Sequence, residues 1–141
     1  MTFLLDTNVV SEWVRARPDP GVVAWLDEVD EDRVFLSVAT LAELRSGIAR
    51  IPTGSRRVRL EDWLGEELPA RFEGRILAID REVALIWGDV VAEREQAGRP
   101  IGAMDAFIAA TARVRDLTLV TRNTRDFAGS VSAVLNPWTV P

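Results

Sequence analysis

Short uncharged apolar runs alternate along this chain with longer segments in which apolar residues recur every three or four positions. The short runs are typical of strands buried on both faces, and the longer segments are typical of amphipathic helices. The runs cover residues 3–5, 34–36, 76–79 and 117–121, and a last edge strand is expected within 134–138. This alternation predicts an α/β fold with a mainly parallel central sheet of four to five strands flanked by helices. The length predicts one domain over residues 1–141.

The first strand leads into a polar turn that carries the first candidate site residue. The run 3–5 is followed by Asp6-Thr7-Asn8, and apolar residues then continue at helical spacing from Val9. Asp6 is therefore expected at the carboxyl end of the strand, where ligands bind in open α/β sheets. A role as a helix cap explains an aspartate here equally well.

Three further acidic residues are expected near the same edge of the sheet. Glu43 lies in the helix after the strand 34–36, Asp105 opens the helix before the strand 117–121, and Asp126 lies in the loop that leaves that strand. Right-handed crossovers bring the carboxyl ends of parallel strands to one edge, so these carboxylates can converge with Asp6. Each also has an ordinary interpretation, as a surface ion pair, a helix-dipole partner or a turn residue.

A cluster of four carboxylates is costly unless a cation neutralises it. Carboxylate oxygens suit hard cations, so the cluster predicts Mg²⁺ or Mn²⁺, and the sequence leaves open whether one or two ions bind. Such a site can activate water and neutralise charge on a phosphodiester. Asn8, Thr121 and Asn123 are expected to position the carboxylates or the substrate.

The residue types that are missing exclude several other chemistries. The chain has no histidine and no cysteine, and every basic side chain is arginine. A Ser-His-Asp triad, a thiolate metal site, a Schiff-base lysine and a P-loop lysine are therefore excluded. Carboxylates, hydroxyls and arginines remain as the candidate catalytic groups.

The charge balance and the hydropathy limit the partners and the location. A net charge of −5 argues against a broad nonspecific nucleic-acid binder, although it allows a nuclease with a small acidic site flanked by local arginines. Arg56, Arg57 and Arg59 form one such cluster, which is either a solvated helix face or an RNA-contacting patch. The chain has no apolar run of membrane-spanning length, no secretion signal and no cysteine, so a cytoplasmic protein is expected.

Four segments together resemble the motifs of PIN domains. They are most similar to those of VapC-type and FitB-type toxins of bacterial toxin–antitoxin pairs, and they cover nearly the whole chain in order. The segments are Leu4–Glu12, Ala42–Leu44, Met104–Ala112 and Leu119–Phe127. The resemblance implies that Asp6, Glu43, Asp105 and Asp126 form an acidic metal-binding quartet. Asn123 competes with Asp126 for the fourth position, since both lie in one loop.

The resemblance also implies an activity and partners. It implies a Mg²⁺- or Mn²⁺-dependent ribonuclease that cuts RNA and slows growth, a cognate antitoxin that lies across the surface helices, and a homodimer. Trp13, Trp25 and Trp63 could line the dimer contact, and they fit equally well in the core.

Three alternative functions differ from this hypothesis. The first is a catalytically weak PIN-like module that acts as an antitoxin partner in transcriptional autoregulation. A phosphorylated receiver domain also clusters acids at strand ends, but that family uses a lysine, which this chain lacks. A dinucleotide-binding domain is disfavoured because no G-x-G-x-x-G follows a predicted strand.

Overall fold

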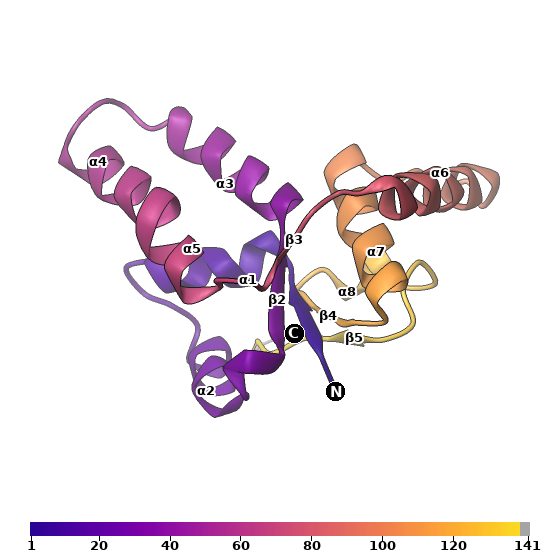
Figure 1. The fold of residues 1–141 in the computed structure, drawn as a ribbon, viewed down its shortest axis with the longest axis horizontal. Coiled ribbons are helices and arrows are strands. Elements are labelled where there is room, and N and C mark those ends of the chain that lie inside the picture. The colour runs from indigo at the N-terminus through magenta and orange to yellow at the C-terminus, as the bar shows by residue number, and fades with distance from the viewer. Residues whose placement is uncertain (139–141) are drawn as a thin grey trace.

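The computed structural model describes residues 1–138, and its centre is a five-stranded sheet in which every pairing is parallel. The order across the sheet is β3-β2-β1-β4-β5 (Figure 1). The strands are β1 (Phe3–Leu5), β2 (Val34–Ser37), β3 (Ile76–Leu77), β4 (Thr118–Val120) and β5 (Val134–Leu135). The predicted α/β class and parallel sheet are confirmed, although β3 and β5 are shorter than the apolar runs suggested.

Helices cover both faces of the sheet. In Figure 1 the helices α1 to α5 lie to one side of the strands, and α6 and α7 lie to the other. The helices are α1 (Thr7–Ser11), the 3₁₀ turn η1 (Glu12–Val14), α2 (Pro20–Glu28), the 3₁₀ turn η2 (Glu31–Arg33), α3 (Val38–Ala49), α4 (Ser55–Asp62), the π-helical turn η3 (Trp63–Glu67), α5 (Leu68–Arg71), α6 (Arg81–Gln96), α7 (Ala103–Arg115) and α8 (Thr124–Phe127).

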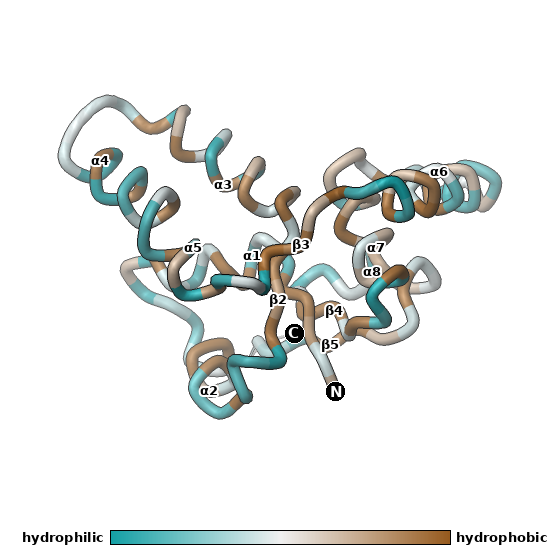
Figure 2. Tube along the Cα trace, in the orientation of Figure 1, coloured by the Kyte–Doolittle hydropathy of each residue, from teal (hydrophilic) through white to brown (hydrophobic). Residues whose placement is uncertain are grey.

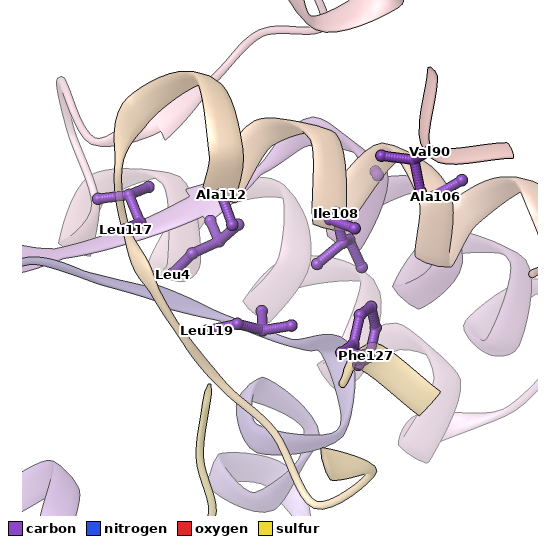
Figure 3. Packing of buried hydrophobic residues seen from close by; sticks show 10 residues of the cluster. Leu4, Val90, Ala106, Ile108, Ala112, Leu117, Leu119 and Phe127 are labelled. Carbon is purple, nitrogen blue, oxygen red and sulfur yellow. The ribbon is translucent and has the colours of Figure 1, made fainter. Parts of the chain in front are cut away.

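Two hydrophobic clusters, one on each face of the sheet, explain why the strands are mostly apolar. Side chains alternate between the faces of a strand, so neighbouring leucines of β1 enter different clusters. Leu4 packs with Leu119 and Phe127 on the α7 side (Figure 3), and Leu5 packs with Val120 on the α1 side. Figure 2 shows this apolar centre as hydrophobic strands surrounded by mixed helices. Both faces of this parallel sheet are buried, whereas an antiparallel sheet commonly has one face exposed to solvent.

Ser37 and Asp80 each precede an apolar pattern of helical spacing and are therefore expected to cap a helix, and Gly98 is expected after the end of one. The structure confirms both caps: the Ser37 hydroxyl accepts from Ala39 N at 3.0 Å to begin α3, and the Asp80 carboxylate accepts from Val83 N at 3.0 Å to begin α6. At the end of α6, Gly98 has a φ of +71°, which suits a glycine.

The segment after α3 differs from what its sequence predicts. Thr53 or Ser55 is expected to cap the helix that follows, and Pro69 is expected to end it. Gly54 is the N-cap of α4 instead, and within residues 1–138 no side chain caps this helix. The helical path also does not end at Pro69, because α4 continues through η3 into α5. Pro69 lies in the first turn of α5, where a missing N–H is tolerated. The wider π turn restarts the hydrogen-bond pattern just before the proline.

The tryptophans for which the sequence allowed either a dimer contact or a core position pack into the hydrophobic cluster on the α1 side of the sheet. They are Trp13, Trp25 and Trp63. Trp13 lies 5.8 Å from the ring of Phe72, and Trp25 meets Phe3 edge-on at 5.1 Å. Trp63 is also a partly buried member of this cluster. The core interpretation of these rings is thus supported, while each keeps part of its surface exposed. Within residues 1–138 no helix is long and apolar enough to cross a membrane.

Candidate active site

The strand order places the first candidate residue at a switch point of the sheet. From β1 the chain builds outward through β2 and β3 in one direction, while β4 and β5 extend the sheet in the other. Ligands of open parallel sheets bind outside the carboxyl ends of the strands at such a point. Asp6 follows β1 and Thr121 follows β4, and the Asp6 N–H donates to the Val120 carbonyl at 2.9 Å.

Asp6 is a buried carboxylate, with 4% of its surface exposed. Its Oδ1 accepts from the Thr7 N–H at 2.8 Å, as a helix cap would, and its Oδ2 accepts from the Thr121 hydroxyl at 2.8 Å. Burial raises the pKa of Asp6 from 3.8 to about 6, with smaller contributions from the charges of Asp105 and Glu43, against the two hydrogen bonds. Capping α1 requires neither this burial nor the bond to the neighbouring strand end.

Glu43 lies in the second turn of α3 and is half-buried. Its Oε1 accepts from the Thr7 hydroxyl at 2.6 Å, and the same hydroxyl lies 3.3 Å from that of Thr40. Within residues 1–138 no arginine pairs with Glu43, so the alternative of a surface ion pair is not supported. Thr7 therefore joins the loop of Asp6 to the helix of Glu43.

Asp105 and Asp126 complete the acidic group. Burial raises the pKa of Asp105, and the charges of Glu43 and then Asp126 raise it further, while Arg94 opposes the shift. Asp126 itself is exposed on α8. Asp105 thus interacts with the other three carboxylates, which come from the end of β1, from α3 and from α8. Their individual roles in catalysis and metal binding stay predictions.

The predicted positioning residues meet at Thr121, whose side chain is fully buried. Besides donating to Asp6, its hydroxyl accepts from the Asn123 N–H at 3.0 Å and lies 3.5 Å from Asn8 Nδ2. Asn8 Oδ1 accepts in turn from the Arg122 N–H at 3.4 Å. Asn123 therefore contributes its backbone to this network, while the charge of Asp126 acts on Asp105. This contrast favours Asp126 over Asn123 as the fourth acidic member.

The donor set suits a hard divalent cation, although the side chains are not drawn together around one. Every candidate donor is a carboxylate oxygen, and burial and mutual repulsion raise the pKa values of Asp6 and Asp105. Among residues 1–138 no three acidic side chains are yet close enough to form a ligand set. The residues fit a Mg²⁺ or Mn²⁺ ion by charge and by donor type, and the carboxylates would have to approach one another to bind it.

A pocket of about 300 Å³ lies between α3 and the start of α7, and Glu43 lines it. Ala42, Ser46, Arg50 and Met104 complete its wall. Sequence periodicity predicts an inward-facing Met104, and this is wrong, because 39% of its surface is exposed. Met104 lies in the first turn of α7, where it lines this pocket, while Ala106 of the same turn packs in the hydrophobic cluster.

Arg94 near the end of α6 is a site residue that sequence reasoning missed. Its Nη1 donates to the Asp126 carbonyl at 2.6 Å and to the Ser130 hydroxyl at 3.1 Å, and its Nε donates to the Arg99 carbonyl at 2.7 Å. It is also the positive charge that opposes the pKa shift of Asp105. In the sequence it is one charged residue at the polar end of an amphipathic helix, and nothing there marks its partners more than 30 residues away.

A comparison with family models decides the classification. The model of the PIN domain matches residues 3–129, which include all four carboxylates. The chain belongs to the PIN-domain family. Toxin FitB of Neisseria gonorrhoeae is 43% identical over 135 residues, which are 96% of this PIN domain and 97% of that protein. VapC ribonuclease Y4jK of Sinorhizobium fredii is 40% identical over 136 residues, 96% of each chain. The structure of FitAB bound to an IR36 DNA fragment superposes with a TM-score of 0.91 at 39% identity, covering 99% of this PIN domain and 98% of that chain.

Proposed function

We propose that this PIN domain is the toxin of a type II toxin–antitoxin pair and acts as a divalent-metal-dependent endoribonuclease. The observation that carries the proposal is Asp6, buried at the switch point of the sheet and coupled by charge to Asp105 and Glu43. The printed names of the similar proteins, a toxin and a VapC ribonuclease, support this assignment.

The four carboxylates would hold Mg²⁺ or Mn²⁺ at the carboxyl edge of the sheet. When bound, such an ion neutralises charge on a phosphodiester and lowers the pKa of a water that can attack it. The surrounding residues of the chain set the directions of the carboxylates. Thr121 holds Oδ2 of Asp6, and Thr7 holds both Oδ1 of Asp6 through its N–H and Glu43 through its hydroxyl. Asn8 and Asn123 act one step further out, on Thr121.

Cleavage of purified RNA tests the enzymatic part of this proposal. Wild-type protein is incubated with tRNA in Mg²⁺, in Mn²⁺ and in EDTA, beside Asp105→Asn and a control, Asp89→Asn, whose carboxylate is exposed on α6. Cleavage should require the metal, fall at least about 100-fold in Asp105→Asn and stay at the wild-type rate in Asp89→Asn. Cleavage that persists in EDTA or in Asp105→Asn would contradict the proposal.

The partners follow from the same assignment. We propose a homodimer that is inhibited by a cognate antitoxin in the cytoplasm, where its RNA substrates are. The DNA-bound FitAB structure also favours a second role, in which the complex binds DNA and represses transcription. One experiment distinguishes RNA cleavage from the regulatory role. Asp105→Asn should still co-purify with the antitoxin and bind operator DNA, while it loses RNA cleavage. If wild type itself cuts no RNA, while both proteins co-purify with the antitoxin and bind operator DNA, the regulatory role is the main one.

A further inference from the structure

In the described part of the chain, residues 1–138, two arginines on α4 have no carboxylate partner although the protein is acidic overall. Arg56 and Arg59 are exposed and form no ion pair within residues 1–138, whereas Arg57 lies 3.7 Å from Glu61 and Arg45 lies 3.0 Å from it. The spacing of three residues places Arg56 and Arg59 on one face of the helix. Figure 2 shows α4 as one of the more hydrophilic helices, and Figure 1 shows it running back beside α3.

This face of α4 forms one wall of a pocket of about 350 Å³, with η1 opposite. Arg56, Arg59, Trp13 and Trp63 line the pocket, together with Val14, Leu60 and the exposed Glu67. A second pocket continues from it towards Arg15 and shares Val14 and Leu60.

A third pocket connects the arginines with the acidic site. It shares Val14, Leu60 and Trp63 with the first pocket, and it reaches Thr7 and Glu43. The three pockets share lining residues along η1 and α4, and together they are here called the α4 groove. Glu43 of the candidate active site lines one of them, and Arg56 and Arg59, which form no ion pair within residues 1–138, line the other two.

The side chains of the α4 groove match the two repeating parts of a single-stranded nucleic acid. Guanidinium groups bind phosphates, and tryptophan rings offer flat surfaces to unstacked bases. The ring of Trp13 already accepts one flat cation, since the guanidinium carbon of Arg71 lies 4.3 Å from its centroid. An apolar protein segment would use the tryptophans but would leave Arg56 and Arg59 without partners.

We propose that the α4 groove binds the single-stranded stretch of RNA next to the cut phosphate, with Arg56 and Arg59 on backbone phosphates and Trp63 against a base. This inference rests on the proposed ribonuclease function and adds the path of the substrate to it. Arg56 and Arg59 are binding residues in this arrangement, and the acidic quartet performs the cleavage.

Removing the two charges tests the inference. Arg56→Gln/Arg59→Gln is compared with Arg33→Gln/Arg81→Gln, a control with the same change in net charge on exposed arginines outside the α4 groove. Affinity for a fluorescein-labelled single-stranded RNA is measured by anisotropy in EDTA over a series of salt concentrations. The groove variant should bind about tenfold more weakly, and its slope of log Kd against log salt should fall by about 1.4, which corresponds to two phosphate contacts on a single strand. Under Mg²⁺ its KM should rise while kcat stays near the wild-type value.

The other possible outcomes contradict either this inference or the proposed ribonuclease function. Equal affinity and equal salt slope in both double variants would overturn the inference. So would a groove variant that binds RNA normally but changes from dimer to monomer or no longer co-purifies with the antitoxin, because the α4 groove would then be a protein interface. The measurement of RNA affinity in EDTA does not depend on cleavage. A wild-type protein that fails to cut RNA, but binds it in a way that depends on Arg56 and Arg59, would contradict the ribonuclease proposal and support the groove.

Discussion

Asp6 is buried with hydroxyl and amide donors, and within residues 1–138 no basic side chain is bonded to it. Such a carboxylate is costly to ionise in the metal-free protein, which is why burial raises its pKa to about 6. The same feature makes the site receptive to a cation, because a bound positive charge removes both the desolvation penalty and the repulsion from Asp105. Stability of the metal-free fold and readiness to bind metal therefore oppose each other at this one residue.

The raised pKa of Asp6 predicts how stability depends on pH. The folded protein binds more protons than the unfolded chain between about pH 4 and pH 6, so the free energy of unfolding falls as the pH rises through this window. Without metal, this effect of Asp6 should reach roughly 3 kcal/mol at neutral pH. Urea unfolding in EDTA should show that wild type loses stability relative to Asp6→Asn by this amount from acid to neutral pH, whereas Asp89→Asn follows wild type. A pH-independent difference between wild type and Asp6→Asn would contradict the assignment.

Thr121 offers a test of orientation that leaves all charges in place. Thr121→Val removes a buried hydroxyl that donates to Asp6 and accepts from the Asn123 N–H. The loss should reduce the free energy of unfolding by about 1–3 kcal/mol. It should also lower the RNA cleavage rate, because Oδ2 of Asp6 loses the donor that directs it. Thr121→Ser, which keeps the hydroxyl, should retain most of both, and a Thr121→Val protein that cuts RNA at the wild-type rate would show that the hydroxyl does not direct Asp6.

The individual elements were predictable where the signal is local. Ser37 and Asp80 cap helices within three residues of themselves, and β1 is a continuous apolar run. The continuation of the helix past Pro69 was not predictable, because the π turn that ends at Glu67 places the proline in a new first helical turn. Arg94 was missed for a related reason, since it bonds across from α6 to the α8 loop and has no local pattern.

The connection made by Arg94 predicts a role in holding α8. Its guanidinium joins the end of α6 to the Asp126 carbonyl and the Ser130 hydroxyl. Arg94→Lys keeps the charge but cannot form the planar set of bonds, so residues 124–130 should exchange amide hydrogens faster and cleavage should need more Mg²⁺. Arg81→Lys on the same helix is the control, because Arg81 is exposed. Unchanged exchange in Arg94→Lys would show that these bonds do not hold α8.

On the scale of the whole molecule, the sequence was sufficient for the α/β class and the parallel sheet, because parallel crossovers leave few places for strand ends. The roles of the four acidic residues stay predictions, and the sequence was not sufficient for the spacing of their carboxylates. The structure adds that the carboxylates interact but are not yet gathered into a ligand set in residues 1–138. The distances between the carboxylates depend on Thr7 and Thr121, which hydrogen-bond to Glu43 and Asp6, and on Arg94, which holds the backbone of Asp126. These three residues belong to separate segments of the chain.

The placement of the carboxylates predicts that metal binding stabilises the entire domain. Glu43 is on α3, on one side of the sheet in Figure 1, and Asp105 is on α7, on the other, so an ion shared by them connects both helical layers. An ion that binds the folded state alone stabilises it by about 2.7 kcal/mol at 100 times its Kd. Thermal unfolding should therefore shift upwards by several degrees with Mn²⁺ in wild type and in Asp89→Asn, and much less in Asp105→Asn. A shift of equal size in Asp105→Asn would mean that the ion binds elsewhere, and the acidic quartet would then not be the metal site.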